Sequence, residues 1–179
     1  MLGKGDDAQP WTDAFLALEG AGWKGRAGSA IGCAPDTEAL FREVVREGQR
    51  RGQLRIARLT TASGVAAMSS WFVSGKRGFG FKMTYDEALR SYAPGLLLMR
   101  YVAEQVGAEP DMFFDTCASP GAHSGAAFWR DRRTMFDCAI AIGTPRRRRL
   151  FSGLMRAREA VRRRSGCLGD LPRQLTQSL

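Results

Sequence analysis

A helix start preceded by cations is the clearest chemical feature of the sequence. In EALRSYAPGLLLMRYVAEQVG, residues 87–107, Pro94 and Gly95 open a predicted helix. The first backbone amides of a helix have no partner within it, and the helix dipole adds partial positive charge at the same end. Together they favour a bound anion, by about 0.3–2 kcal/mol from the dipole alone. Lys82 and Arg90 precede this end and are candidate anion contacts.

Candidate acid and base groups lie on both sides of this helix. Asp115 ends the apolar run PDMFFD, where a carboxylate is a candidate general base. Tyr85 and Asp86, followed by Glu87, are candidate catalytic or substrate-contacting residues. A plainer interpretation of each acid stays open: Asp115 caps a turn, and Asp86 and Glu87 stabilise a helix N-terminus.

A loop rich in glycine, serine and proline follows, in CASPGAHSGAAFW. It holds His123, and loops often carry function, so His123 is a candidate substrate contact. Trp129 and Arg132 follow as candidates for lining an acceptor groove; the alternative is a strand with a packed tryptophan and exposed arginines. Cys117 and His123 do not predict covalent catalysis, because such a dyad needs a third group that orients the base.

Several classes of protein are excluded or disfavoured. GFGFKM lacks the third glycine of a dinucleotide fingerprint, and no G-x-x-x-x-G-K-[ST] motif occurs. The four cysteines are widely spaced and His123 is the only histidine, so we expect no metal site and reduced thiols in the cytoplasm. No apolar run approaches about 18 residues, and no signal-peptide pattern opens the chain.

The positive charge is concentrated near the C-terminus. The chain has a net charge of +9, and residues 145–179 hold ten arginines against Glu159 and Asp170, which leaves +1 for the other 144 residues. Apolar side chains alternate with these arginines. The segment therefore predicts a helix that binds an anionic membrane, for example at the inner membrane face, or RNA. The alternative is a terminal helix that packs one apolar face on the domain.

The elements predicted from the spacing of apolar residues and turn signals define an α+β fold with a mostly antiparallel central sheet flanked by helices. We expect Thr12 and Asp36 to cap the first two helices, and a glycine-rich loop over residues 20–32. The predicted helices are 12–20, 36–51 and 94–106. The predicted strands are 53–61, 64–75, 78–85, a short one within 110–118 and a further strand region over 126–143.

Two segments about sixty residues apart, LEGAGWKGR and KMTYDEALRSYAPGLLL, together with the later FFD, resemble a known family. They are similar to the CelD/BcsL-type acetyltransferases, which have the GNAT fold and are related to the FemAB transferases. The resemblance covers residues 12–142, and members are usually longer, with two GNAT-like halves of which this chain matches the second. It implies an acyltransferase domain over 11–144. The polar, Gly- and Asp-rich start predicts a flexible N-terminus over 1–10, and the arginine-rich segment predicts a helical tail over 145–179.

The resemblance also implies a donor and a mechanism. GNAT enzymes bind the pyrophosphate of acetyl-CoA or another acyl-CoA at a helix start with the pattern [RQ]-x-x-G-x-[GA]. The acyl group would pass by direct attack to an amine or hydroxyl acceptor, such as a saccharide or a cell-envelope precursor, with a backbone amide of FGFKM polarising the thioester. The implied donor-binding residues are Lys82, Met83, Arg90, Ser91, Tyr92, Ala93, Gly95 and Leu96.

Two alternatives stay open at this point. Ala93 occupies the first glycine position of the pattern, and Pro94 removes one amide donor. This departure suits a GNAT-like binding module without catalysis. The basic tail instead suits a FemAB-like transferase that takes its acyl group from aminoacyl-tRNA.

Overall fold

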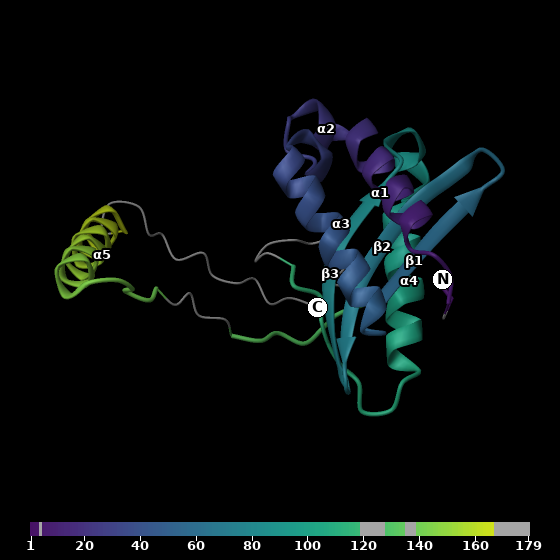
Figure 1. The fold of residues 1–179 in the computed structure, drawn as a ribbon. Helices are drawn as coiled ribbons and strands as arrows, with labels where there is room; N and C mark the ends of the chain where they lie inside the picture. The colour runs from purple at the N-terminus through teal and green to yellow at the C-terminus, as the bar shows by residue number, and fades with distance from the viewer. Residues whose placement is uncertain (4, 119–127, 135–138, 167–179) are drawn as a thin grey trace. The chain divides into compact units, whose positions relative to one another are not determined.

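The computed structural model describes residues 1–3, 5–118, 128–134 and 139–166 of the chain. The chain divides into two compact units, Met1–Asp131 and Arg132–Leu179. The first unit contains a four-stranded sheet with helices on both faces (Figure 1). The second unit contains the helix α5 (Pro145–Gly166). No helix among the described residues is long and apolar enough to cross a membrane.

The sheet has the strand order β1-β2-β3-β4. The first three strands form an antiparallel meander, and β4 pairs with β3 in parallel. This confirms the predicted α+β fold with a mostly antiparallel sheet, and the predicted short fourth strand. The strands span Leu54–Thr61 (β1), Gly64–Ser74 (β2), Arg77–Tyr85 (β3) and Phe113–Asp115 (β4).

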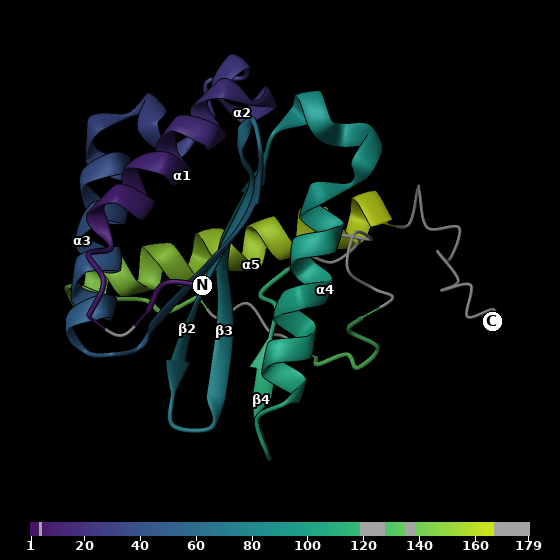
Figure 2. The same cartoon turned by 90° about the vertical axis from the view of Figure 1, so that its right-hand side faces the viewer.

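Alternation along the central strands sends side chains into two cores, one on each face of the sheet. Helices lie on both of these faces (Figure 2). Helices α1 (Gln9–Ala21) and α3 (Pro35–Arg50) cover one face, where Phe15 and Phe41 pack with their ring centroids 5.3 Å apart. Helix α4 (Pro94–Gly107) covers the other face through Leu98, Val102 and Val106. The predicted helix over 94–106 is thereby confirmed.

Both predicted helix caps are wrong, for the same reason. Proline fixes the backbone angle that a first helical turn needs, so it starts a helix ahead of a nearby polar residue. Pro10 lies in the first turn of α1, and Thr12 sits inside the helix, where its Oγ1 donates to Ala8 O at 2.8 Å. Pro35 likewise begins α3 after Ala34, which leaves Asp36 in the first turn.

Two other predictions need correction. The predicted loop over 20–32 contains a helical turn, α2 (Trp23–Arg26), and a 3₁₀ turn, η1 (Ile31–Cys33). The predicted strand region over 126–143 is wrong within 128–134 and 139–143, where the described residues form no strand. Trp129 instead stacks on Phe114, with the ring centroids 4.9 Å apart.

The first residues of the chain make defined contacts with the sheet and the helices. Leu2 N donates to Ile56 O at 2.8 Å, and the side chain of Ala8 is buried in the core below α1. Helix α1 begins at Gln9, inside the stretch for which the sequence predicts flexibility. The apolar residues at positions 2 and 8 explain these contacts, because each removes its surface from water.

A candidate active site at the end of strand β3

Glycine lets α2 pack closely against the end of α1. A Cβ atom at Gly25 would overlap the backbone oxygen of Gly20, so no larger residue fits without a shift of one helix. Glu19, with 2% of its side chain exposed, accepts hydrogen bonds from Lys24 Nζ and from Ile31 N, both at 2.8 Å. These contacts fix α2 in place, and its residues Trp23 and Arg26 with it.

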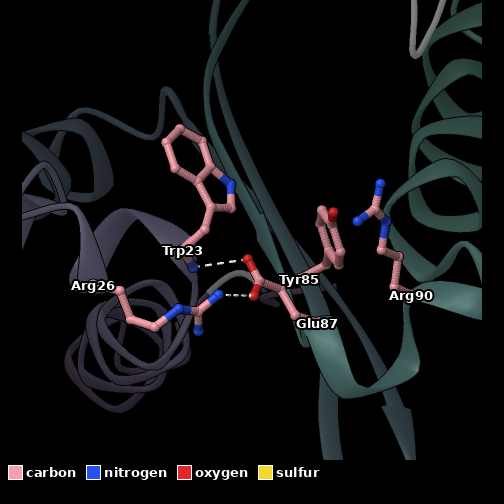
Figure 3. Close-up of a pocket in the computed structure, with 5 residues that line it drawn as sticks. All are labelled: Trp23, Arg26, Tyr85, Glu87 and Arg90. Carbon is pink, nitrogen blue, oxygen red and sulfur yellow. Dashed lines mark hydrogen bonds and ion pairs between the residues drawn. The ribbon is translucent and has the colours of Figure 1, made fainter.

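Glu87 ties α2 to the segment that follows β3. Its Oε1 accepts a hydrogen bond from Trp23 N at 2.7 Å, and its Oε2 pairs with the guanidinium of Arg26 (Figure 3). The Arg26 hydrogen bond, and after it the Trp23 bond, holds the pKa of Glu87 below its ordinary value of 4.5. The ionised carboxylate of Glu87 therefore joins α2 to the turn after β3, and its lowered pKa makes it a weak base.

These contacts create an open cleft of about 410 Å³ at the end of β3. Figure 3 shows it between α2 on one side and the start of α4 on the other. Trp23 has 56% of its surface exposed, and Arg90 makes no ion pair within the described part of the chain. The cleft thus offers an aromatic surface and an available cation. Its lining residues are Trp23, Arg26, Tyr85, Glu87 and Arg90.

The start of α4 offers fewer free amides than its sequence indicates. Ala93 precedes the helix with φ 49° and ψ 49°, in the left-handed region that favours glycine. Its carbonyl accepts from Leu96 N at 2.9 Å and from Leu97 N at 3.1 Å, and Pro94 has no N–H. Among the described residues, only the Gly95 amide in this first turn has no acceptor. The Arg90 guanidinium is therefore the main candidate for an anion contact at this end of α4.

Tyr85 rests on the first turn of α4, and Gly95 makes room for it. A Cβ at Gly95 would lie 3.3 Å from Tyr85 Cδ1 and 3.8 Å from Met83 Cε. Asp86 has a structural role: its Oδ1 accepts from Ala88 N at 2.9 Å and caps the 3₁₀ turn η2 (Glu87–Tyr92). This contact matches the interpretation of Asp86 as an acid that stabilises a helix N-terminus.

Next to the cleft, part of strand β3 has an edge that no described strand covers, which we call the open edge of β3. Strand β4 pairs only with Arg77–Phe79. The β2–β3 register passes from Trp71↔Gly80 to Ser70↔Lys82, so Phe81 is the extra residue of a bulge. Beyond the bulge, residues 81–85 have no strand partner on the β4 side within the described ranges. Their backbone groups on that side can bind an extended ligand.

The other sequence-predicted site residues lie in different places. Asp115 is half-buried opposite Phe79, two residues before the bulge, and its Oδ1 accepts from Cys117 N at 2.8 Å. Ser91 and Tyr92 are exposed on η2, and Leu96 is exposed on the first turn of α4. Arg132 is exposed and belongs to the second unit. His123 lies outside the described residues.

The sequence interpretation assigned no site role to Trp23 or Arg26. Both stand in LEGAGWKGR, one of the two segments that carry the family resemblance. The other segment supplies Tyr85, Glu87 and Arg90, so the two segments meet in one cleft. The family resemblance rests on both segments, and this was the one sign in the sequence that they belong to the same site. The sequence alone does not show that Glu87 joins them.

Comparison with known proteins identifies the family of this fold. A family model described as an acetyltransferase (GNAT) domain matches residues 3–129. The match covers most of the 179-residue chain, which therefore belongs to the GNAT acetyltransferase family and is a transferase enzyme. Enzymes of this family use acyl-CoA as co-substrate. No curated protein matches the chain.

Proposed function

We propose that the enzyme transfers an acetyl or other acyl group from acyl-CoA to an amine or hydroxyl acceptor, with the donor held along the open edge of β3. One observation carries this proposal: Glu87 draws two distant segments into a cleft that adjoins both the start of α4 and the open strand edge. A bound donor can then contact a cation at one end and a strand edge along its length.

The anionic end of the donor belongs at Arg90. Arg26 also faces the cleft, but its guanidinium is neutralised by Glu87, whereas Arg90 keeps its charge available. A guanidinium binds phosphate oxygens with paired N–H donors. These donors replace the helix amide of Leu96, which is already bonded to Ala93 O. The Gly95 amide and the dipole of α4 add to the attraction.

The pantetheine arm belongs on residues 81–85. It contains amide groups, and an extended amide chain pairs with an open strand edge as an added strand does. Four residues of strand span about 13 Å, so the arm would lead from the cleft toward the bulge at Phe81. A backbone amide at the bulge, near Lys82, would polarise the thioester carbonyl.

Direct attack completes the reaction at that end. The acceptor nitrogen or oxygen forms a bond to the acyl carbon and loses a proton while the carbon–sulfur bond breaks. The coenzyme leaves as its thiolate, which then takes up a proton to become the thiol. Asp115 lies opposite Phe79, near the bulge, and is the proposed proton acceptor. Positioning of the two reactants contributes most of the rate enhancement, about 7–11 kcal/mol for well-oriented groups.

The proposed acceptor class is a saccharide or a cell-envelope precursor. The resemblance to CelD/BcsL-type enzymes motivates it. Trp129, stacked on Phe114 next to Asp115 on β4, is the proposed aromatic contact for the apolar face of a sugar ring.

Turnover with defined donors tests the proposal. The enzyme is incubated with acetyl-CoA and, in separate reactions, with amino sugars, neutral sugars and small amines, and release of the coenzyme thiol is followed. Acceptor-dependent thiol release supports acyl transfer from CoA. If the acyl group moves only when aminoacyl-tRNA replaces acetyl-CoA, the donor assignment is wrong and the FemAB-like alternative replaces it.

A further inference from the structure

Helix α5 has a surface that acyl transfer does not use. Of its 22 residues, nine are arginine and one, Glu159, is acidic, which gives the helix a net charge of +8. It also carries large apolar side chains that face water: Leu150 is 66% exposed, Leu154 61% and Val161 62%. A helix that is both strongly basic and openly apolar needs a partner with both kinds of surface.

Four apolar residues of α5 form one stripe, which we define as Leu150, Leu154, Ala157 and Val161. Their spacing of i, i+4, i+7 and i+11 places them on a single helix face. At 3.6 residues per turn, Arg146, Arg147 and Arg158 lie about 50–70° to either side of this stripe. Glu159 lies on the opposite face.

This arrangement matches the interface of a membrane. A helix that lies in the headgroup region buries its apolar stripe among the acyl chains, while arginines at the borders reach the lipid phosphates. RNA would engage the arginines but would leave the leucines and the valine in water. The exposed stripe therefore favours lipid over RNA as the partner.

We propose that α5 is an interfacial helix that attaches this acyltransferase to an anionic membrane surface. The apolar stripe inserts, the flanking arginines bind anionic headgroups, and an acceptor held at that surface meets the enzyme there. Attachment of this kind is reversible, because neither the stripe nor the charge crosses the bilayer.

Vesicle co-sedimentation of the full-length protein tests this proposal. Vesicles of phosphatidylcholine with phosphatidylglycerol are compared with vesicles of phosphatidylcholine alone, at low and high salt. We expect binding to the anionic vesicles only, weakened by salt because the headgroup contacts are screened. Equal binding to both vesicles, or to neither, overturns the proposal.

Matched variants separate the two contributions. Leu150→Ala with Leu154→Ala preserves helix formation and should reduce vesicle affinity at least tenfold, because two buried leucines are lost. Arg147→Gln with Arg158→Gln should reduce it by roughly tenfold or more. The controls are Leu40→Ala, which alters a leucine 64% exposed on α3, and Arg46→Gln, also on α3. Both should leave binding unchanged.

The same variants identify the competing partner. If RNA binds the wild type tightly and the leucine variant binds both RNA and vesicles as the wild type does, the stripe has no role and α5 is an RNA-binding segment. Far-UV circular dichroism of each variant shows whether α5 remains helical. Weaker vesicle binding in a variant with unchanged helix content supports insertion of the stripe.

Discussion

Oε1 of Glu87 accepts the backbone N–H of Trp23 at 2.7 Å, although 64 residues separate the two along the chain. The bond joins α2 to the turn after β3, and Arg26 closes the same contact from α2. The cleft that we assign to the donor exists because of this contact. We assign the carboxylate a positioning role.

Glu87→Gln should therefore lower activity through positioning. The amide keeps the acceptor for Trp23 N but loses the ion pair with Arg26, so α2 is held less firmly. We expect a higher KM for the donor with little change in kcat, measured by steady-state kinetics. A fall in kcat at unchanged KM would instead make Glu87 a catalytic group.

The pH dependence of stability follows from the lowered pKa of Glu87. A carboxylate whose native pKa lies below its ordinary value of 4.5 stabilises the fold above that value. This contribution is lost as the pH falls through the native pKa. Unfolding measured from neutral pH downward should show a smaller acid-side loss of stability in Glu87→Gln than in the wild type. Equal losses in both proteins would mean that Glu87 gains nothing from Arg26 in solution.

Gly25→Ala should displace α2. The added Cβ overlaps the backbone oxygen of Gly20, which cannot move without α1, so we expect destabilisation of about 1–3 kcal/mol and loss of donor binding. Gly20→Ala is the matched control, since a Cβ there meets nothing within 4 Å. It should be neutral or stabilising by up to about 1 kcal/mol, since alanine favours helix. Denaturant unfolding distinguishes the two.

Gly95→Ala should act on the donor site with little effect on stability. The Cβ would lie 3.3 Å from Tyr85 Cδ1, so the ring must shift by a few tenths of an ångström. We expect a several-fold increase in KM for the donor. Gly107→Ala, at the open end of the same helix, has no atom within 4 Å of its Cβ and should leave KM unchanged. Identical kinetics for both variants would exclude Tyr85 from the donor site.

Asp115→Asn separates catalysis from structure. Asparagine keeps the oxygen that accepts Cys117 N, so the turn after β4 and the melting temperature should be preserved. If Asp115 takes the proton of the acceptor, kcat should fall by about 10²–10⁴-fold while donor affinity stays constant. Full activity in the variant would exclude Asp115 as the proton acceptor.

Local signals in the sequence were sufficient for much of the fold. The turn before Gly64 and the turn at Gly75 separate three β-rich runs, and these runs form the observed meander. Pro94 starts α4 where its fixed backbone angle predicts. The glycines of residues 20–32 led to the wrong prediction of a loop, because Gly25 allows two helices to pack closely and does not make the segment flexible. A periodic pattern cannot show that difference.

The site was only partly visible in the sequence. Tyr85 and Arg90 were found because they lie next to a helix start, and both line the cleft. The pair Glu87 and Arg26 was missed, because opposite charges 61 residues apart are common and only the fold brings these two together. The amides at the start of α4 were overestimated, because the sequence does not show that the carbonyl of Ala93 also accepts the Leu96 amide, which is otherwise free in a first helical turn.

Donor binding at Arg90 is the central claim, and thermal unfolding with acetyl-CoA tests it most directly. At about 100 times the dissociation constant, a ligand that binds only the folded state adds about 2.7 kcal/mol, enough to raise Tm by several degrees. We predict this rise for the wild type and for the control Arg46→Gln, and its loss in Arg90→Gln. No rise in the wild type, or an equal rise in all three proteins, would contradict the assignment.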